Sequence, residues 1–365
     1  MKKIFYCLLA FLGTIHVLCA DDGGGRIGEN LQPFQPGIIR GTKVFFNGAR
    51  TEVPMEFLLV VFFRSPDADL QEIELILQEA MAGRGNIVHL SGAPADMLQS
   101  YCSNLPAGLE FMTVAYDHGD AIAKRVLPGN VVLPFAVLAD RTGEILWMGE
   151  PMEFPDVFPA ITAGTYDNSK RAAAIPYYSN LASAIRSGKL ETVRTATAPI
   201  LQMEPGNPTA VQALMFFLEQ SGNTAEAWQI LQNAMDAAPE SRFLTMLAIN
   251  FGTRELNYAS VIPGMVKKEV IAGGSDREKL SAAFLLLNGY GFEITALDLA
   301  EEILASVKEI TPEVLEFRAL SAYRHGNPAA AAEFQKQAID LAVLSDNGMN
   351  KRLEFYRTLA ERMTK

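Results

Sequence analysis

Cysteine is scarce in this chain of 365 residues, which holds only Cys7, Cys19 and Cys102. No two of them have the spacing of a CxxC motif. Thiol–disulfide exchange needs a reactive thiolate with a second thiol beside it, and a structural zinc site needs several closely spaced ligands. The sequence therefore argues against a CxxC redox centre, a zinc finger and a disulfide framework.

Basic residues are outnumbered by acidic ones. The chain has 31 Lys and Arg against 42 Asp and Glu, a formal charge of −11, and its basic residues form no cluster. Such a chain is a poor candidate for binding nucleic acid or anionic lipid. His89, His118 and His325 are scattered, so we expect no metal site, and no motif points to a cofactor.

The first twenty residues have the pattern of a secretory signal peptide. Lys2 and Lys3 precede an apolar run from Ile4 to Leu18, and Ala20 supplies a small residue for cleavage. Leu18 stands where a lipoprotein signal has a small residue, so lipidation is not expected. We therefore expect residues 1–20 to be removed and residues 21–38 to be a flexible leader. The mature chain is expected to be an exported soluble protein, periplasmic or otherwise extracytoplasmic, without a membrane segment.

Residues 39–167 alternate short apolar strands with helices, which predicts an α/β domain. The last two strands are joined by a turn that ends in Gly143, as in a β-hairpin. The predicted strands cover residues 58–63, 86–91, 111–116, 135–140 and 144–148, and the predicted helices cover residues 70–81, 95–102 and 120–126.

The stretch VLPFAVLADRTGEILWMG, residues 132–149, is similar to a motif of TlpA-like and redoxin-type exported thioredoxins. The resemblance covers about a third of the chain and implies a thioredoxin-like fold. It also implies that Pro134 is a cis-proline and that Leu133 presents its backbone to a groove, where an extended peptide could bind.

The segment from Leu58 to Ala80 resembles the first strand, active-site loop and following helix of that fold, but without its cysteines. Its loop contains Ser65, Pro66, Asp67 and Asp69. We interpret Asp69 and the Glu three residues later as a capping box. The alternative makes Asp67 or Asp69 a general base, although no nearby histidine accompanies either.

Cys102 is the one cysteine of the mature chain, at the end of the second predicted helix. A buried, unreactive thiol is the expected state at such a place. The alternative is a reactive thiol, which would need an exposed and electropositive setting.

From residue 168 the strands give way to Ala- and Leu-rich helices with a repeat of about 34 residues. Gly188, Gly222, Gly291 and Gly326 mark the period, with Leu256 in the remaining slot. The pattern resembles tetratricopeptide repeats. We expect about five repeats over residues 168–345, a capping helix over residues 346–365, and a domain junction near residues 168–171.

The first helix of each repeat carries residues that would line the concave groove of such a solenoid, and this groove would bind a protein or peptide partner. An alternative left open by the sequence is that some of these residues belong to the core. The candidates are Tyr178, Gln212, Phe216, Met246, Asn250, Leu285, Asn288 and Tyr323.

Together these patterns predict an exported, non-catalytic protein that acts in protein–protein interaction or scaffolding. Two alternatives remain at this stage. One is thiol–disulfide or peroxidase chemistry through Cys102. The other is chaperone-like peptide binding at the cis-proline groove, with no redox chemistry.

Overall fold

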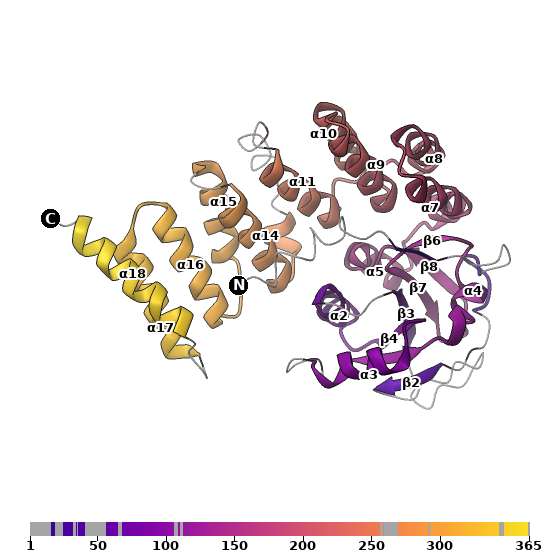
Figure 1. Cartoon of the computed structure of the whole chain (residues 1–365), viewed down its shortest axis with the longest axis horizontal. Helices are drawn as coiled ribbons and strands as arrows, with labels where there is room; N and C mark the ends of the chain where they lie inside the picture. Colours follow the sequence, from indigo (N-terminus) through magenta and orange to yellow (C-terminus); the bar gives the residue numbers. More distant parts are fainter. Residues whose placement is uncertain are drawn as a thin grey trace. The chain divides into compact units, whose positions relative to one another are not determined.

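The computed structural model describes residues 16–18, 25–31, 34, 36–40, 56–64, 68–105, 109, 112–255, 258, 269–290, 293–342 and 347–363. It divides into two compact units, Met1–Leu244 and Thr245–Lys365. A mixed α/β domain comes first and packed antiparallel helices follow it (Figure 1), which confirms the predicted fold class.

The strands are β1 His16–Leu18, β2 Gly37–Arg40, β3 Phe57–Phe63, β4 Gly85–Ser91, β5 Thr113–Tyr116, β6 Val131–Leu133, β7 Phe135–Asp140 and β8 Ile145–Gly149. The helical segments among and just after them are α2 Ala68–Met81, α3 Ala95–Ser103, η1 His118–Asp120, α4 Ala123–Val126, η2 Pro151–Glu153 and α5 Phe154–Thr162.

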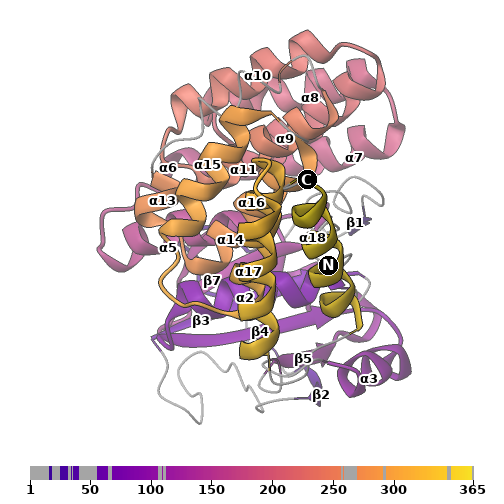
Figure 2. The same ribbon diagram turned by 90° about the vertical axis from the view of Figure 1, so that its left-hand side faces the viewer.

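The main sheet has six strands in the order β2-β5-β4-β3-β7-β8. Strands β3, β4 and β5 are parallel, and β2, β7 and β8 pair antiparallel with their neighbours. All seven residues of β3 are buried, as a continuous apolar run in a central strand predicts. Helix α2 lies along β3 and β4 in both ribbon views (Figure 2).

Aromatic residues fill the core where α2 and α5 pack on the sheet. Trp147 of β8 lies 5.7 Å from Phe154 of α5, and the ring of Phe154 stacks on Phe158 at 4.8 Å. Leu77 of α2 belongs to the same cluster and is fully buried. This packing fixes α5 against the sheet, and the chain leaves the sheet domain from there.

The helices that follow in the first unit are α6 Ser169–Ala174, η3 Ile175–Tyr177, α7 Tyr178–Ser187, α8 Leu190–Met203, α9 Pro208–Gln220 and α10 Thr224–Ala237. Helix α11, Arg242–Arg254, contains the boundary between the units. The second unit contains α13 Glu269–Gly273, α14 Asp276–Gly289, α15 Ile294–Ala305, α16 Pro312–Arg324, α17 Pro328–Leu341 and α18 Asn347–Met363.

Glycines end helices in this region where the backbone turns left-handed. Gly188, Gly222 and Gly326 have φ of 69°, 75° and 77°, values that a residue with a Cβ adopts only at a cost. Gly291 and Leu256, predicted to mark the same period, lie outside the described residues. The period seen in the sequence is therefore set by helix ends.

Two buried polar side chains face each other inside the sheet domain. Oε2 of Glu74, on α2, lies 3.4 Å from Nε2 of His89, on β4, and neither residue is more than 2% exposed. Burial raises the pKa of Glu74 to about 7 and lowers the pKa of His89 to about 3. Near pH 6 the two groups therefore face each other largely uncharged.

This pairing predicts a pH-dependent stability. The unfolded chain releases the proton of Glu74 above pH 4.5, whereas the folded chain holds it until about pH 7. The contribution of Glu74 to the free energy of unfolding should therefore fall as pH rises through this window, whereas the lowered pKa of His89 contributes the opposite slope below pH 6.5. A comparison of wild type with a variant at Glu74 isolates the first contribution. Glu74→Gln, which cannot ionise, should gain on the order of 1–3 kcal/mol relative to wild type between pH 5 and pH 8, measured by denaturant unfolding.

Glu79→Gln is the matched control, because Glu79 is an exposed residue of the same helix. It should leave the pH profile unchanged. A Glu74→Gln profile parallel to that of wild type would show that Glu74 is ionised in the folded protein.

Candidate functional site

The loop that resembles a thioredoxin active site lies mostly outside the described residues. Ser65, Pro66 and Asp67 are among those not described. Asp69 lies in the first turn of α2, and its side chain is likewise outside the described part. The capping and general-base interpretations of this loop therefore stay predictions.

The described residues around this loop bond to one another at the carboxyl ends of β3, β4 and β5. Ser91 Oγ donates to the carbonyl of Arg64 at 3.1 Å, and Arg64 lies 3.5 Å from a carboxylate oxygen of Asp120. The buried carboxylate of Asp117 accepts the backbone N–H groups of Ile122 and Ala123 at 2.8 Å each. These bonds hold the loops at this end of the sheet in place.

The peptide bond between Leu133 and Pro134 is cis, as the resemblance implied. Just before it, β6 forms a small antiparallel sheet with β1. His16 pairs with Leu133, and Leu18 pairs with Val131. The edge of β6 therefore holds an extended segment from a distant part of this chain by main-chain pairing.

Helix α7 is packed beside β6. The backbone N–H of Asn130 donates to Ser179 Oγ at 3.2 Å. The ring of Phe135, which follows the cis-proline, meets the ring of Tyr178 edge to face at 6.0 Å. The first of the longer helices after the sheet domain thus contacts the cis-proline segment directly.

Cys102 is buried in α3 among apolar residues that include Leu98 and Met112. Burial raises the pKa of its thiol, against an opposing effect of the Arg40 guanidinium. Arg40 donates to the backbone carbonyl of Cys102. A buried thiol with a raised pKa offers little thiolate for exchange or peroxide reduction.

The predicted groove residues differ in exposure and fall into three groups. Tyr178, Asn250 and Leu285 are buried, at 3%, 1% and 6% exposure, so their side chains are part of the core. Asn288 is exposed. The partly exposed members, which can touch a partner, are Gln212, Phe216, Met246 and Tyr323.

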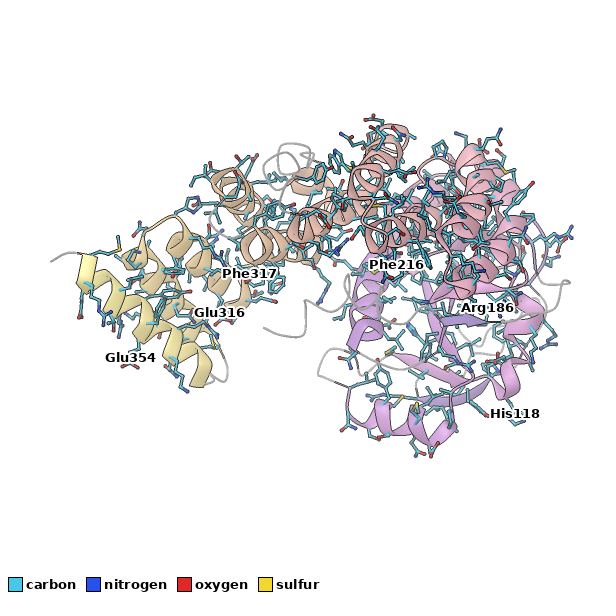
Figure 3. The ribbon with its side chains drawn as sticks, turned by 45° about the horizontal axis from the view of Figure 1, so that its top comes forward. His118, Arg186, Phe216, Glu316, Phe317 and Glu354 are labelled. Atoms are coloured by element: carbon cyan, nitrogen blue, oxygen red, sulfur yellow. The ribbon has the colours of Figure 1, made fainter. Side chains whose placement is uncertain are left out.

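Figure 3 labels Phe216 on α9, beside Phe217 at an edge-to-face distance of 5.3 Å. It therefore presents an aromatic ring next to buried neighbours. Partly exposed aromatic side chains of this kind are common at protein interfaces.

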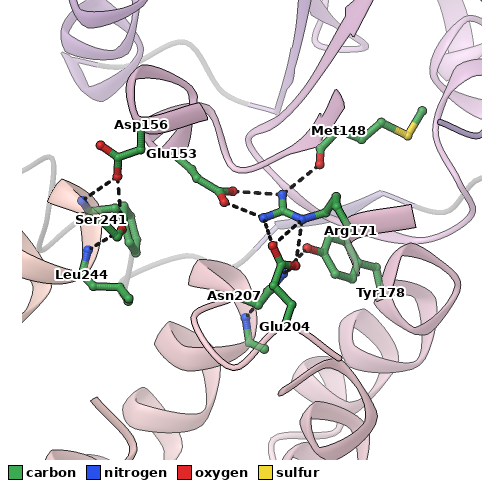
Figure 4. A network of polar contacts seen from close by, with 11 residues as sticks. Met148, Glu153, Asp156, Arg171, Tyr178, Glu204, Asn207, Ser241 and Leu244 are labelled. Atoms are coloured by element: carbon green, nitrogen blue, oxygen red, sulfur yellow. Dashed lines mark hydrogen bonds and ion pairs between the residues drawn. The ribbon is translucent and has the colours of Figure 1, made fainter. Parts of the chain in front are cut away.

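Sequence reasoning missed Arg171 of α6, whose polar contacts are drawn in Figure 4. Its side chain is 1% exposed. Its guanidinium donates to the Met148 carbonyl at 3.0 Å and to Glu153 at 2.5 and 3.0 Å. It also donates to Glu204 at 2.8, 2.9 and 3.2 Å.

The electrostatic surroundings of Arg171 favour its charged form. Burial alone disfavours the charged guanidinium, but Glu153 and Glu204 outweigh it and hold the pKa of Arg171 well above its ordinary value. Gly149 leaves room for this side chain, because a Cβ there would collide with the guanidinium. The predicted junction near residues 168–171 thus contains one of the most buried side chains of the first unit.

Two further contacts extend this network. Tyr178 accepts a hydrogen bond from Asn207 at 2.7 Å, and Asn207 also donates to Glu204 at 2.7 Å. On α5, Asp156 accepts from Ser241 at 3.1 Å and from Arg242 at 2.9 Å. Met148, Glu153 and Asp156 belong to the sheet domain. The bonds of Arg171 therefore join α6 to the sheet domain, and the bonds of Asp156 join the start of α11 to it.

Little in the sequence pointed to this network. Arg171 follows Lys170 and precedes three alanines, and Glu153 lies two residues after Pro151. Their pairing could not be read from spacing, because Glu204 is 33 residues from Arg171.

The described residues contain no group of three or more His, Cys, Asp or Glu placed to hold a metal ion. Among the helices of the described chain, none is long and apolar enough to cross a membrane.

No family model matches the chain, and no curated protein matches it. Among solved structures, it is similar to the solution structure of a putative protein disulfide isomerase from Bacteroides thetaiotaomicron, at 16% identity with a TM-score of 0.30. That similarity covers 40% of this chain and 94% of the other. By its own strand order and helices, the chain is a mixed α/β sheet domain followed by packed antiparallel helices.

The Arg171 network predicts a large effect of one substitution. Arg171→Met should lower the free energy of unfolding by about 3–5 kcal/mol, because it leaves Glu153 and Glu204 without their partner. The loss should be larger at pH 8 than at pH 5, where Glu153 can take up a proton in place of the guanidinium. Denaturant unfolding of the full chain at both pH values measures it.

Arg186→Met is the control, since Arg186 is exposed on α7 and labelled in Figure 3. It should change stability by less than about 1 kcal/mol. Equal effects of the two substitutions would mean that the buried pairs contribute no more than a surface charge.

Proposed function

We propose that this protein is an exported, non-catalytic binding protein that acts as a scaffold for a protein or peptide partner. Two features together carry the proposal: the absence of cysteine from the loop that resembles a thioredoxin active site, and the main-chain pairing at the edge of β6. The loop contains no cysteine, and the edge of β6, just before Pro134, holds an extended segment by main-chain pairing. Cys102 is buried away in α3.

The finer family assignment belongs to the same proposal. The motif around Pro134 supports a TlpA-like or redoxin-type origin of the sheet domain. The helix pairs with left-handed glycines at Gly188, Gly222 and Gly326 support a tetratricopeptide-like solenoid. Its partner surface would include Gln212 and Phe216 in the first unit and Tyr323 in the second unit, each of them partly exposed.

In-cell cross-linking followed by mass spectrometry tests the scaffold. A partner captured by the tagged wild-type protein should be lost with Phe216→Ser or Tyr323→Ser, since these substitutions remove aromatic contact area. It should be kept with Cys102→Ser and with Met97→Ser, which alters an exposed apolar residue of α3.

A partner that is held through a reducible bond and is lost with Cys102→Ser would contradict the scaffold proposal. It would support thiol chemistry at Cys102 instead. Capture unaffected by both groove substitutions would remove the helical surface from the proposal.

Peptide binding at the β6 edge is a second candidate function, favoured by the pairing of β1 with β6. Residues 16–18 fall within the predicted signal peptide, and its cleavage would free this edge. An extended peptide could then take the same place by antiparallel pairing with Val131–Leu133.

This candidate predicts competition between the leader and an added peptide. A chain that begins at Asp21 should bind a fluorescent unfolded polypeptide at least about tenfold more tightly than the full chain, because β6 then has an unpaired edge. Fluorescence anisotropy measures both affinities. Pro134→Ala should weaken the binding, and equal affinities for all three proteins would count against the site.

A further inference from the structure

Helix α18, Asn347–Met363, buries one face against the rest of the second unit. Met349 and Tyr356 are 7% and 5% exposed and pack in clusters with residues of α16 and α17. Arg352 forms an ion pair with Glu316 of α16. These contacts fix both the position of the helix and the face that it turns outward.

The outward face of α18 lines a shallow groove of about 330 Å³. Its residues recur at intervals of three and four, which places them on one side of a helix. They are Lys351, Glu354, Phe355, Thr358, Leu359 and Arg362.

Phe355 is the apolar centre of this face, at 51% exposure. Its ring lies 5.5 Å from Tyr323 of α16 and 5.6 Å from Tyr356. An exposed ring that its neighbours hold in place loses little conformational entropy when a partner covers it.

The charges on this face are complementary to those on the same face of a second, antiparallel copy of the helix. When two antiparallel helices cross at one residue, a position n residues before the crossing lies opposite the position n residues after it in the other helix. Glu354 precedes Thr358 by four residues and Arg362 follows it by four. A two-fold axis at Thr358 therefore places each Glu354 opposite the Arg362 of the other copy.

The two remaining features of the face fit the same arrangement. Lys351 would lie near the C-terminal end of the other copy's α18, where unpaired backbone carbonyls favour a positive charge. Thr358 would lie at the crossing point, where a small side chain allows the helices to approach closely. Phe355 lies three residues before the crossing point, so α18 of the second copy would cover its ring.

From this self-complementarity we infer that α18 is a dimerisation surface, and that its occupant is α18 of a second copy of this chain in antiparallel orientation. One helix pair is at the small end of stable interfaces, so the dimer should dissociate in the micromolar range.

Charge reversal tests the register. Sedimentation equilibrium of the full chain from about 1 to about 300 μM should show a monomer–dimer equilibrium, as expected for a small interface. Glu354→Arg and Arg362→Glu should each raise the dissociation constant at least about tenfold, because each places like charges opposite one another twice.

An equimolar mixture of the two variants should dimerise about as tightly as wild type. In that heterodimer both positions again bring an acidic residue opposite a basic one. A role of either residue within its own chain cannot produce this rescue, because each variant keeps its defect when mixed.

Glu302→Arg and Lys336→Glu are the charge-matched controls, at exposed positions of α15 and α17. They should dimerise like wild type. A monomeric wild type over the whole range would overturn the inference, as would a mixture that remains monomeric; a foreign helix would then be the occupant to test.

Discussion

The described part of the first unit depends on the buried guanidinium of Arg171. It joins a carbonyl of β8, a carboxylate of η2 and the carboxylate that follows α8. A buried charge restricts the positions of the groups that surround it. If one partner moves away, the charge stays buried without compensation and the folded state is destabilised. This constraint ties α6 and the end of α8 to the sheet, all within the compact unit that ends at Leu244.

That attachment bears on how the sheet domain works. Helix α7 contacts the cis-proline segment through Ser179 and Tyr178. A peptide on the β6 edge would thus lie beside α7. This helix follows the sheet domain in sequence but packs directly against it. The proposed binding edge and the proposed scaffold share one framework, and neither needs the thiol of Cys102.

The sequence predicted the regular elements well where packing repeats a simple pattern. Three expected features are present. They are the buried apolar strand β3, the β-hairpin whose turn ends at Gly143, and the cis bond before Pro134. The groove residues were harder to predict. Tyr178 and Leu285 fall on the predicted face but are buried, because a helix packed among other helices is apolar on more than one face and only its neighbours decide which face is covered.

The sequence by itself determined the fold class, the glycine-marked helix ends and the lack of a cysteine pair, since these follow from local patterns and composition. Only the tertiary structure decided the partners of Arg171, the pairing of Glu74 with His89 and the outward face of α18. The physical reason is that these depend on contacts between residues distant in sequence. Burial then changes what each side chain does, from the charge on Glu74 to the exposure of Phe355.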